Sequence, residues 1–142
     1  MTEIAHTTSE TTIRVMGTQG TPDVLLTLPV ADYDGSPVEI KLSIAYANFI
    51  PDGSANCGLW FLLYDGSSPL SMIGFYGAHS STMNRQAPFE VSDVLEDDRA
   101  PEGSHVFSVR VWKWAPQQDS YIAAGDGVSG HPKPMRLSAR YL

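Results

Sequence analysis

The sequence has 142 residues, 42% of them hydrophobic, and carries a formal net charge of −7. That length suits one domain with its own core, and the hydrophobic fraction excludes wholesale disorder. The acidic excess disfavours nucleic acid as a partner, because phosphate binding relies on concentrated Lys and Arg. With one cysteine, Cys57, an internal disulfide is excluded, and no apolar run reaches the length that membrane insertion requires.

The first residues, MTEIAHTTSETT, are polar and acidic and do not read as a secretory signal, so we expect the protein to be made in a cytoplasm. Charge is unevenly divided along the chain. Residues 1–100 carry 13 acidic and 4 basic side chains, whereas residues 101–142 carry 3 acidic and 5 basic ones. One interpretation is that the uneven charge supports head-to-tail or side-to-side association of copies. The alternative is that the charged residues only keep the protein soluble.

Short apolar segments between Gly- and Pro-rich turns predict an all-β chain. We expect residues 1–20 to form an N-terminal arm or a first strand, and residues 21–142 to form the folded domain. The predicted strands are Thr12–Met16, Val24–Leu28, Val38–Asn48, Cys57–Tyr64, Leu70–Tyr76, Phe89–Leu95, Val106–Trp114, Tyr121–Ala123 and Met135–Tyr141. About 8–10 antiparallel strands at this spacing are typical of a single-domain jelly-roll β-sandwich.

The clearest of these strands is the segment 38–48, in which apolar and polar residues alternate. This period of two indicates a strand with one buried face. The residues predicted to face the core are Val38, Ile40, Leu42, Ile44 and Tyr46. We expect the preceding residues 32–37 to form a turn and residues 77–88 to form a long polar loop.

The segment 106–114 has two different faces. Phe107, Val109 and Val111 alternate on a face that suits the core. The opposite face carries Trp112 and Trp114 beside basic residues. Exposed aromatic clusters of this kind mark subunit interfaces or ligand platforms, although a loop covering one of the two indoles also explains part of the pattern.

The end of the chain resembles the C-terminus of C1q- and TNF-like jelly rolls, which small phage virion proteins often carry. The resemblance lies in residues 103–112, which read GSHVFSVRVW, in the Gly-rich turn region that follows, and in the closing strand Met135–Leu142. The segment SPVEIKLSIAYANF resembles the long second strand of the same fold. The match covers roughly residues 20–142 in layout.

This resemblance implies a homotrimer around a threefold axis with aromatic residues in the subunit contacts. The implied role is a non-enzymatic virion structural protein, either a capsid decoration protein or a minor tail protein, which binds capsid or tail proteins of the particle. It would be assembled in the host cytoplasm and located in the virion. The candidate interface residues are Trp60, Tyr64, Arg110, Trp112 and Trp114.

The alternative hypothesis is a lectin-like module that binds carbohydrate or a receptor. Polar loops at one end of the sandwich would supply hydrogen bonds, and an exposed aromatic ring would stack on a sugar. The loops in question are 77–88 and 125–134. The candidate ligand residues are His79, Asn84, Arg85, Gln86 and His131.

Catalytic and metal-binding motifs do not stand out. The four histidines lie in separate segments without the spacing of a zinc site. None of the serines sits in a Gly-x-Ser-x-Gly elbow, and no Gly-rich loop opens a helix. We therefore expect no enzymatic activity, no metal and no cofactor.

Overall fold

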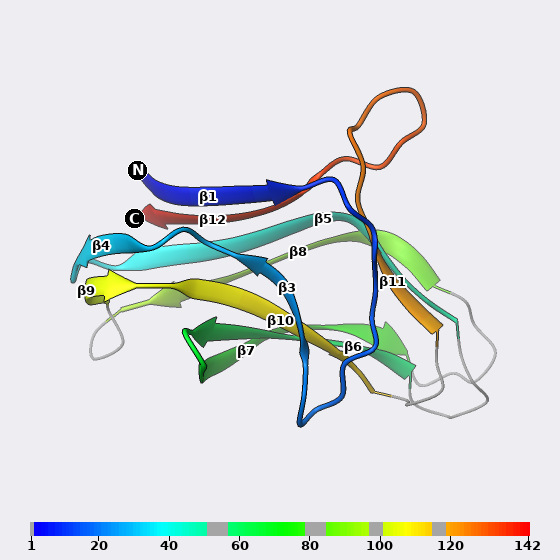
Figure 1. Ribbon diagram of the computed structural model, residues 1–142, viewed down its shortest axis with the longest axis horizontal. Helices are drawn as coiled ribbons and strands as arrows, with labels where there is room; N and C mark the ends of the chain where they lie inside the picture. The colour runs from blue at the N-terminus through cyan, green and yellow to red at the C-terminus, as the bar shows by residue number, and fades with distance from the viewer. Residues whose placement is uncertain (1, 51–56, 79–84, 97–100, 115–118) are drawn as a thin grey trace.

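A computed structural model describes residues 2–50, 57–78, 85–96, 101–114 and 119–142, and for residues 49, 50, 57, 78 and 85–87 it describes the backbone alone. These residues form twelve strands (Figure 1). The strands are β1 (Glu3–Ser9), β2 (Ile13–Arg14), β3 (Asp23–Thr27), β4 (Ala31–Asp34), β5 (Val38–Ile50), β6 (Cys57–Asp65), β7 (Ser68–Ala78), β8 (Arg85–Leu95), β9 (Glu102–His105), β10 (Phe107–Lys113), β11 (Asp119–Ala123) and β12 (Met135–Tyr141).

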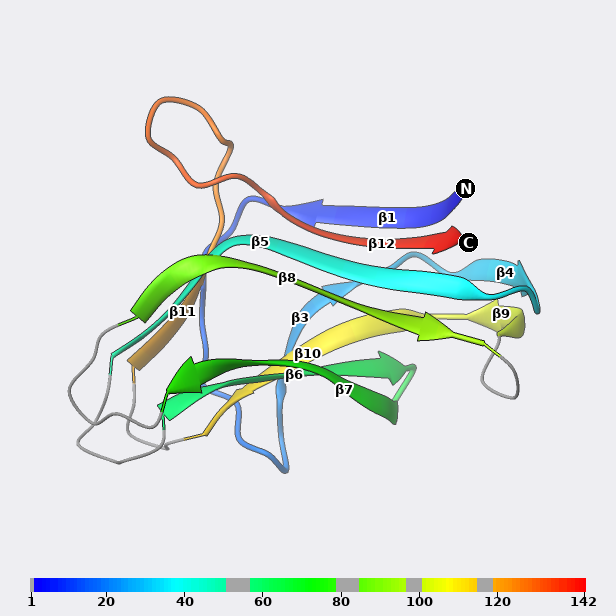
Figure 2. The same cartoon turned by 180° about the vertical axis from the view of Figure 1, so that it is seen from behind.

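Two antiparallel sheets face each other as a sandwich (Figures 1 and 2). The first sheet has the order β1-β12-β5-β11-β2, with β8 also paired to β5, and the second has the order β3-β10-β6-β7. A small ribbon of β4 and β9 lies at one end. The chain crosses repeatedly between the sheets, as in jelly rolls. The predicted class, an all-β jelly-roll sandwich, is confirmed. The strands β1, β4 and β9, which are not among the nine predicted segments, raise the number of described strands to twelve.

The inner faces of the two sheets form one hydrophobic core. The fully buried side chains of β6 and β10 are Leu59, Phe61, Leu63, Phe107, Val109 and Val111. The predicted inward face of β10 is therefore confirmed. Because neighbouring residues of a strand point to opposite faces, the residues between these six point outward from the second sheet.

The alternation predicted for β5 holds over its first half and then shifts. Val38 and Ile44 mark the ends of the run that is buried as predicted, but Tyr46 is only partly buried and Ala47 takes the core position. The pairing of β5 with β8 has an irregularity between Ile44 and Ala47. An extra residue at a bulge moves the following side chains to the other face, and the sequence pattern contains no sign of it.

Several predicted boundaries were wrong. Both ends of the predicted loop 77–88 belong to strands, because β7 runs to Ala78 and β8 begins at Arg85, and residues 79–84 lie outside the described residues. The predicted turn 32–37 includes the end of β4, whose Tyr33 is buried. The predicted strand 106–114 starts one residue later and stops before Trp114, and the separate strand β9 precedes it and pairs with β4.

Residues 3–9 form a strand in the structure. β1 pairs antiparallel with β12 at the edge of the first sheet, so the first and last strands of the chain lie side by side (Figure 1). The predicted strand 12–16 is reduced to the two residues of β2, which pair with β11.

Candidate functional site

Three aromatic side chains form a row across the outer face of the second sheet. The register places Trp60 of β6 opposite Trp112 of β10 on one side and opposite Phe75 of β7 on the other. Residues directly opposite each other share a sheet face, and their side chains touch. The ring centroids of Trp60 and Trp112 are 5.6 Å apart with an interplanar angle of 18°, and those of Trp60 and Phe75 are 4.3 Å apart.

Trp114 closes this cluster from the end of β10. Its ring meets Trp60 edge-on at 5.9 Å and Phe75 edge-on at 5.4 Å. The indole Nε1 of Trp60 is buried and has no hydrogen-bond partner among the described residues. Four rings are thus held against one another without contributing to the core between the sheets.

The next row of the same face carries three aliphatic side chains and one arginine. Leu62 lies opposite Met72 of β7 and Arg110 of β10, and Arg110 lies opposite Val24 of β3. Met72 is 54% exposed and Val24 is 51% exposed. The outward residues Trp60, Leu62, Met72, Phe75, Trp112 and Trp114 are called the aromatic face below.

Arg110 and Tyr64 form a separate pair beside the aromatic face. The Arg110 guanidinium lies 4.0 Å from the centre of the Tyr64 ring, and its Nη2 donates to the carbonyl oxygen of Gly66 at 3.3 Å. The guanidinium therefore covers the Tyr64 ring while it keeps one hydrogen bond. The ability to do both is one reason why arginine is common at protein interfaces.

An open groove of about 350 Å³ runs along the aromatic face. It is lined by Gln19, Trp60, Leu62, Met72 and Trp112. The amide of Gln19 can both donate and accept hydrogen bonds, whereas the other four side chains present mainly carbon atoms. The groove thus suits an apolar surface.

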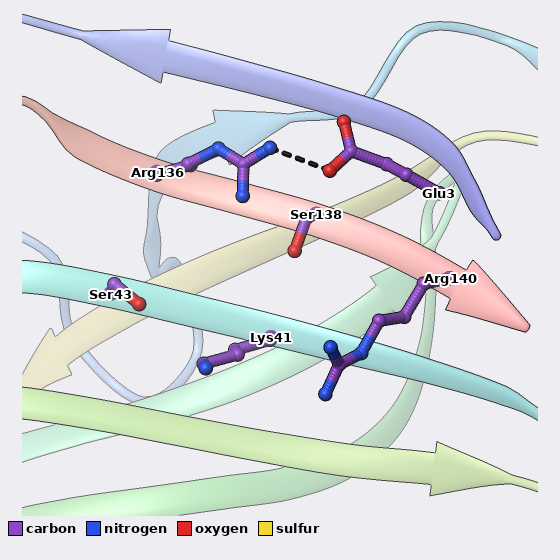
Figure 3. A pocket seen from close by; sticks show the side chains of 6 residues that line it. All are labelled: Glu3, Lys41, Ser43, Arg136, Ser138 and Arg140. Atoms are coloured by element: carbon purple, nitrogen blue, oxygen red, sulfur yellow. Dashed lines mark hydrogen bonds and ion pairs between the residues drawn. The ribbon is translucent and has the colours of Figure 1, made fainter. Parts of the chain in front are cut away.

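The outer face of the first sheet has the opposite character. A hollow of about 120 Å³ there is lined by Glu3, Lys41, Ser43, Arg136, Ser138 and Arg140 (Figure 3). Each of the three cations forms an ion pair: Arg136 with Glu3 at 2.7 Å, Arg140 with Glu39 at 2.6 Å and Lys41 with Glu90 at 3.2 Å. Alternating charges of this kind suit contact with water.

The five predicted interface residues all point outward from the second sheet. Trp60, Trp112 and Trp114 are in mutual contact through Trp60, and Tyr64 and Arg110 form their own pair on the same side. Sequence reasoning missed three members of the aromatic face, namely Leu62, Met72 and Phe75. Leu62 follows Trp60 by two positions, which is the signal that identifies it; the other two depend on the pairing of β7 with β6.

The structure does not describe the predicted ligand residues as one site. His79 and Asn84 lie outside the described residues. Arg85 and Gln86 belong to β8 rather than to a loop, so their predicted location was wrong. His131 is exposed in the 125–134 loop as predicted, where its Nδ1 lies 2.8 Å from Asp126 Oδ1.

A second histidine contact ties the β4–β9 ribbon to the sandwich. His105 Nδ1 lies 2.7 Å from Asp65 Oδ2, and His105 Nε2 lies 3.1 Å from the carbonyl oxygen of Glu102. The adjacent Tyr33 ring packs edge-on against Phe107 at 5.2 Å. Burial, then the nearby Tyr141 and Asp65, raise the pKa of Tyr33 to about 12.

Within the described ranges, no three His, Cys, Asp or Glu side chains gather where they would hold a metal ion. Across the same ranges, no helix is long and apolar enough to cross a membrane.

No family model matches the sequence, and no curated protein matches it. A chain of T=1 particles derived from infectious bursal virus is similar over 94% of this chain and 34% of its own, with 12% identity and a TM-score of 0.41. The chain thus spans about a third of that viral chain.

Two further structures are similar at the same low level. The CBM22-1–GH10 modules of Clostridium thermocellum endo-1,4-beta-D-xylanase 10B, solved with xylohexaose, are similar over 98% of this chain and 28% of their own, with 9% identity and a TM-score of 0.38. A CBM4 structure is similar over 99% of this chain and 94% of its own, with 9% identity and a TM-score of 0.30. These similarities assign neither a family nor a function.

Proposed function

We propose that this chain is a non-enzymatic structural protein that assembles as a homotrimer and buries its aromatic face between copies. The observation that carries the proposal is the row of contacting rings of Trp112, Trp60 and Phe75 on the outside of an already packed sandwich. Leu62 and Met72 lie beside this row. The role is association rather than chemistry.

The composition of the face supports a protein contact. Trp, Phe, Met and Arg are enriched in the centres of protein interfaces, and Trp, Tyr and Arg carry most of the binding energy where they are buried. A standard interface buries about 800 Å² per partner, and its apolar part contributes about 25 cal/mol per Å² before the cost of association is subtracted. A face that presents four contacting rings and two aliphatic side chains supplies such a centre.

The trimer and its setting rest on the resemblance of residues 103–112 and 135–142 to C1q- and TNF-like jelly rolls of small phage virion proteins. In a threefold ring, each contact joins two different surfaces of the chain. We therefore propose that the protein belongs to a phage virion, as capsid decoration or as part of the tail, and that it assembles in the host cytoplasm with capsid or tail proteins as partners.

A charge placed on the aromatic face tests this proposal. We compare Met72→Asp with Val128→Asp, because both residues are exposed, at 54% and 59%, but Val128 lies in the 125–134 loop. Sedimentation velocity should show dissociation of Met72→Asp and an unchanged oligomer for Val128→Asp. Equal sedimentation of the wild type and Met72→Asp would overturn the assignment of the face.

Carbohydrate binding is the second candidate, and one observation favours it. Trp60 and Trp112 are nearly parallel, and they line the groove together with the polar Gln19. Flat aromatic rings stack on sugar faces, and a glutamine amide bonds to hydroxyls. A glycan array with the purified protein tests it: saturable binding that Trp112→Ala abolishes supports this function, and an array without signal rejects it.

A further inference from the structure

The first strand of the chain is attached to the rest mainly through its backbone. Among the described strands β1 pairs with β12 alone, from Glu3 opposite Arg140 to Ser9 opposite Met135. Most of its side chains are polar, and Ile4 and Ala5 are its residues that pack, partly buried, against the core. A strand held in this way contributes little apolar burial, so its detachment costs little compared with that of a core strand.

The Glu3 carboxylate contacts Arg136 of β12 and also His6 of β1 itself, whose Nδ1 lies 2.6 Å from Glu3 Oε1. Figure 3 shows the Glu3 carboxylate turned toward Arg136, whose Nη2 donates to Glu3 Oε2 at 2.7 Å. The remaining residues around this hollow come from β5 and β12: Lys41, Ser43, Ser138 and Arg140. The hydrogen bond from Arg136 is the main cause that lowers the pKa of Glu3. Because Lys41 pairs with Glu90 and Arg140 pairs with Glu39, Arg136 is the cation of this hollow that contacts the Glu3 carboxylate. The hollow, called the seat of Glu3 below, offers the same contact whichever copy supplies Glu3.

The ion pair of Glu3 with Arg136 is also open to solvent, so water can replace either partner. Glu3 is 43% exposed and Arg136 is 44% exposed, and ion pairs at such exposure contribute about 0–1 kcal/mol. They fix where the strand binds without holding it there permanently.

A hinge follows the strand. The fixed part of the chain begins at Thr12, whose Oγ1 donates to the carbonyl oxygen of Ala124 at 3.0 Å and accepts from the amide of Ala124 at 3.1 Å. Between the end of β1 at Ser9 and this anchor lie Glu10 and Thr11, both exposed and outside any strand. A rotation at these two residues redirects β1 without disturbing the sandwich.

We propose that β1 is an exchangeable arm, which in the assembled protein pairs with β12 of a neighbouring copy and places its Glu3 in that copy's seat. This inference rests on the self-association proposed above. The exchanged strand makes the same hydrogen bonds and the same ion pair as the unexchanged one, so exchange adds little energetic cost beyond association itself. In a closed ring, each copy gives one arm and receives one.

Disulfide trapping tests the exchange. The matched pair is His6→Cys and Ser138→Cys, because these two positions face each other across β1 and β12, at a separation that a disulfide spans. Both are made in a Cys57→Ser background, which removes the natural thiol. Arg136 and Glu3 remain intact, and the contact that Glu3 loses with His6 lies within β1, so it is lost equally in the exchanged and the unexchanged arrangement. The double variant is oxidised at the concentration where the protein associates and is run on a non-reducing denaturing gel.

Exchange predicts covalent dimers and trimers of the double variant. It also predicts a disulfide between chains when the two single variants are mixed, unfolded, refolded together and oxidised. Monomers with the disulfide inside one chain would overturn the exchange, and so would the absence of any disulfide in the double variant, because the strand register would then be wrong.

Light scattering on the same samples distinguishes the failure of the strand exchange from the failure of the proposed self-association. A trimer with links inside single chains would retain the proposed function and reject the exchange. A monomer at every concentration would reject both. Arg136→Gln, compared with Lys133→Gln in the exposed loop, should lower the yield of interchain links without changing the yield in the control.

Discussion

Trp60 and Trp112 stack against each other across β6 and β10, 5.6 Å between centroids, on the side of the sheet that faces away from the core. The opposite side of the same two strands is completely buried. The indoles therefore do not serve the packing of the two sheets, and their apolar area is available to another surface. That relationship is the basis for a face that associates, and the predictions below separate its effects from those of the core.

Two neighbouring leucines should differ sharply. Leu63 is fully buried, and Leu63→Ala should lower the free energy of unfolding by about 2–5 kcal/mol, because it leaves a cavity in the core. Leu62 lies on the aromatic face, so Leu62→Ala should mainly weaken self-association. Urea denaturation gives the first quantity and the concentration dependence of the sedimentation coefficient gives the second. Similar unfolding losses in both variants would contradict the assignment of the two faces.

A methyl group at Gly74 should strain the contact between the sheets. A Cβ at this position would lie 2.5 Å from Val91 Cγ1 of β8, closer than non-bonded carbons approach. Gly74→Ala should therefore cost about 1–3 kcal/mol of unfolding free energy, measured by urea denaturation. The double variant Gly74→Ala/Val91→Ala should recover part of that loss. If the loss of unfolding free energy in the double variant equals the sum of the losses in Gly74→Ala and Val91→Ala, the two residues are not in contact.

The ionisation of Tyr33 should lower the stability of the fold in alkali. Because burial raises its pKa to about 12, its contribution to stability is fully present below pH 10 and is lost as the pH rises from 10 through about 12. Its hydroxyl is buried without a hydrogen-bond partner among the described residues, so Tyr33→Phe should retain or increase stability at neutral pH. Ultraviolet titration of tyrosinate follows the pKa. A large loss of stability in Tyr33→Phe at pH 7 would contradict this environment.

Acid should weaken the contacts on the outer face of the first sheet. The pKa of Glu90 is lowered below 4.5, first by the hydrogen bond that Ser43 Oγ donates and then by Lys41. A lowered pKa stabilises the folded state above about pH 4.5, and this contribution disappears as the pH falls through the folded-state pKa. Ser43→Ala should raise the pKa of Glu90, as measured by carbon-13 NMR of the carboxyl group. The pKa of Glu3, which depends on Arg136, should stay unchanged as the control.

Alternation along single strands allowed much of this architecture to be predicted. The buried run of β5 and the two faces of β10 follow from the alternation of residue types along each of these segments of the sequence. The buried Tyr33 could not be found in this way, because its neighbours Asp32, Asp34 and Gly35 are typical of a turn. Among the described strands, its strand β4 pairs with β9, which comes from a distant part of the chain.

The same limit applies to the candidate site. Trp112 and Trp114 stand out because they are two positions apart in one segment that the sequence predicts to be a strand. Phe75 and Met72 join them through the register of β7 on β6, which contains two irregularities that no local pattern reveals. The bulge in β5 exchanges Tyr46 for Ala47 for the same reason. Long-range register, rather than local propensity, separates what could be predicted from what could not.

The solution mass of the purified wild-type chain tests the central claim most directly. Multi-angle light scattering on a sizing column should give three times the protomer mass of 15.5 kDa, and the mass should persist at high salt because an apolar face is not screened. A mass of 15.5 kDa at every concentration would contradict assembly through the aromatic face.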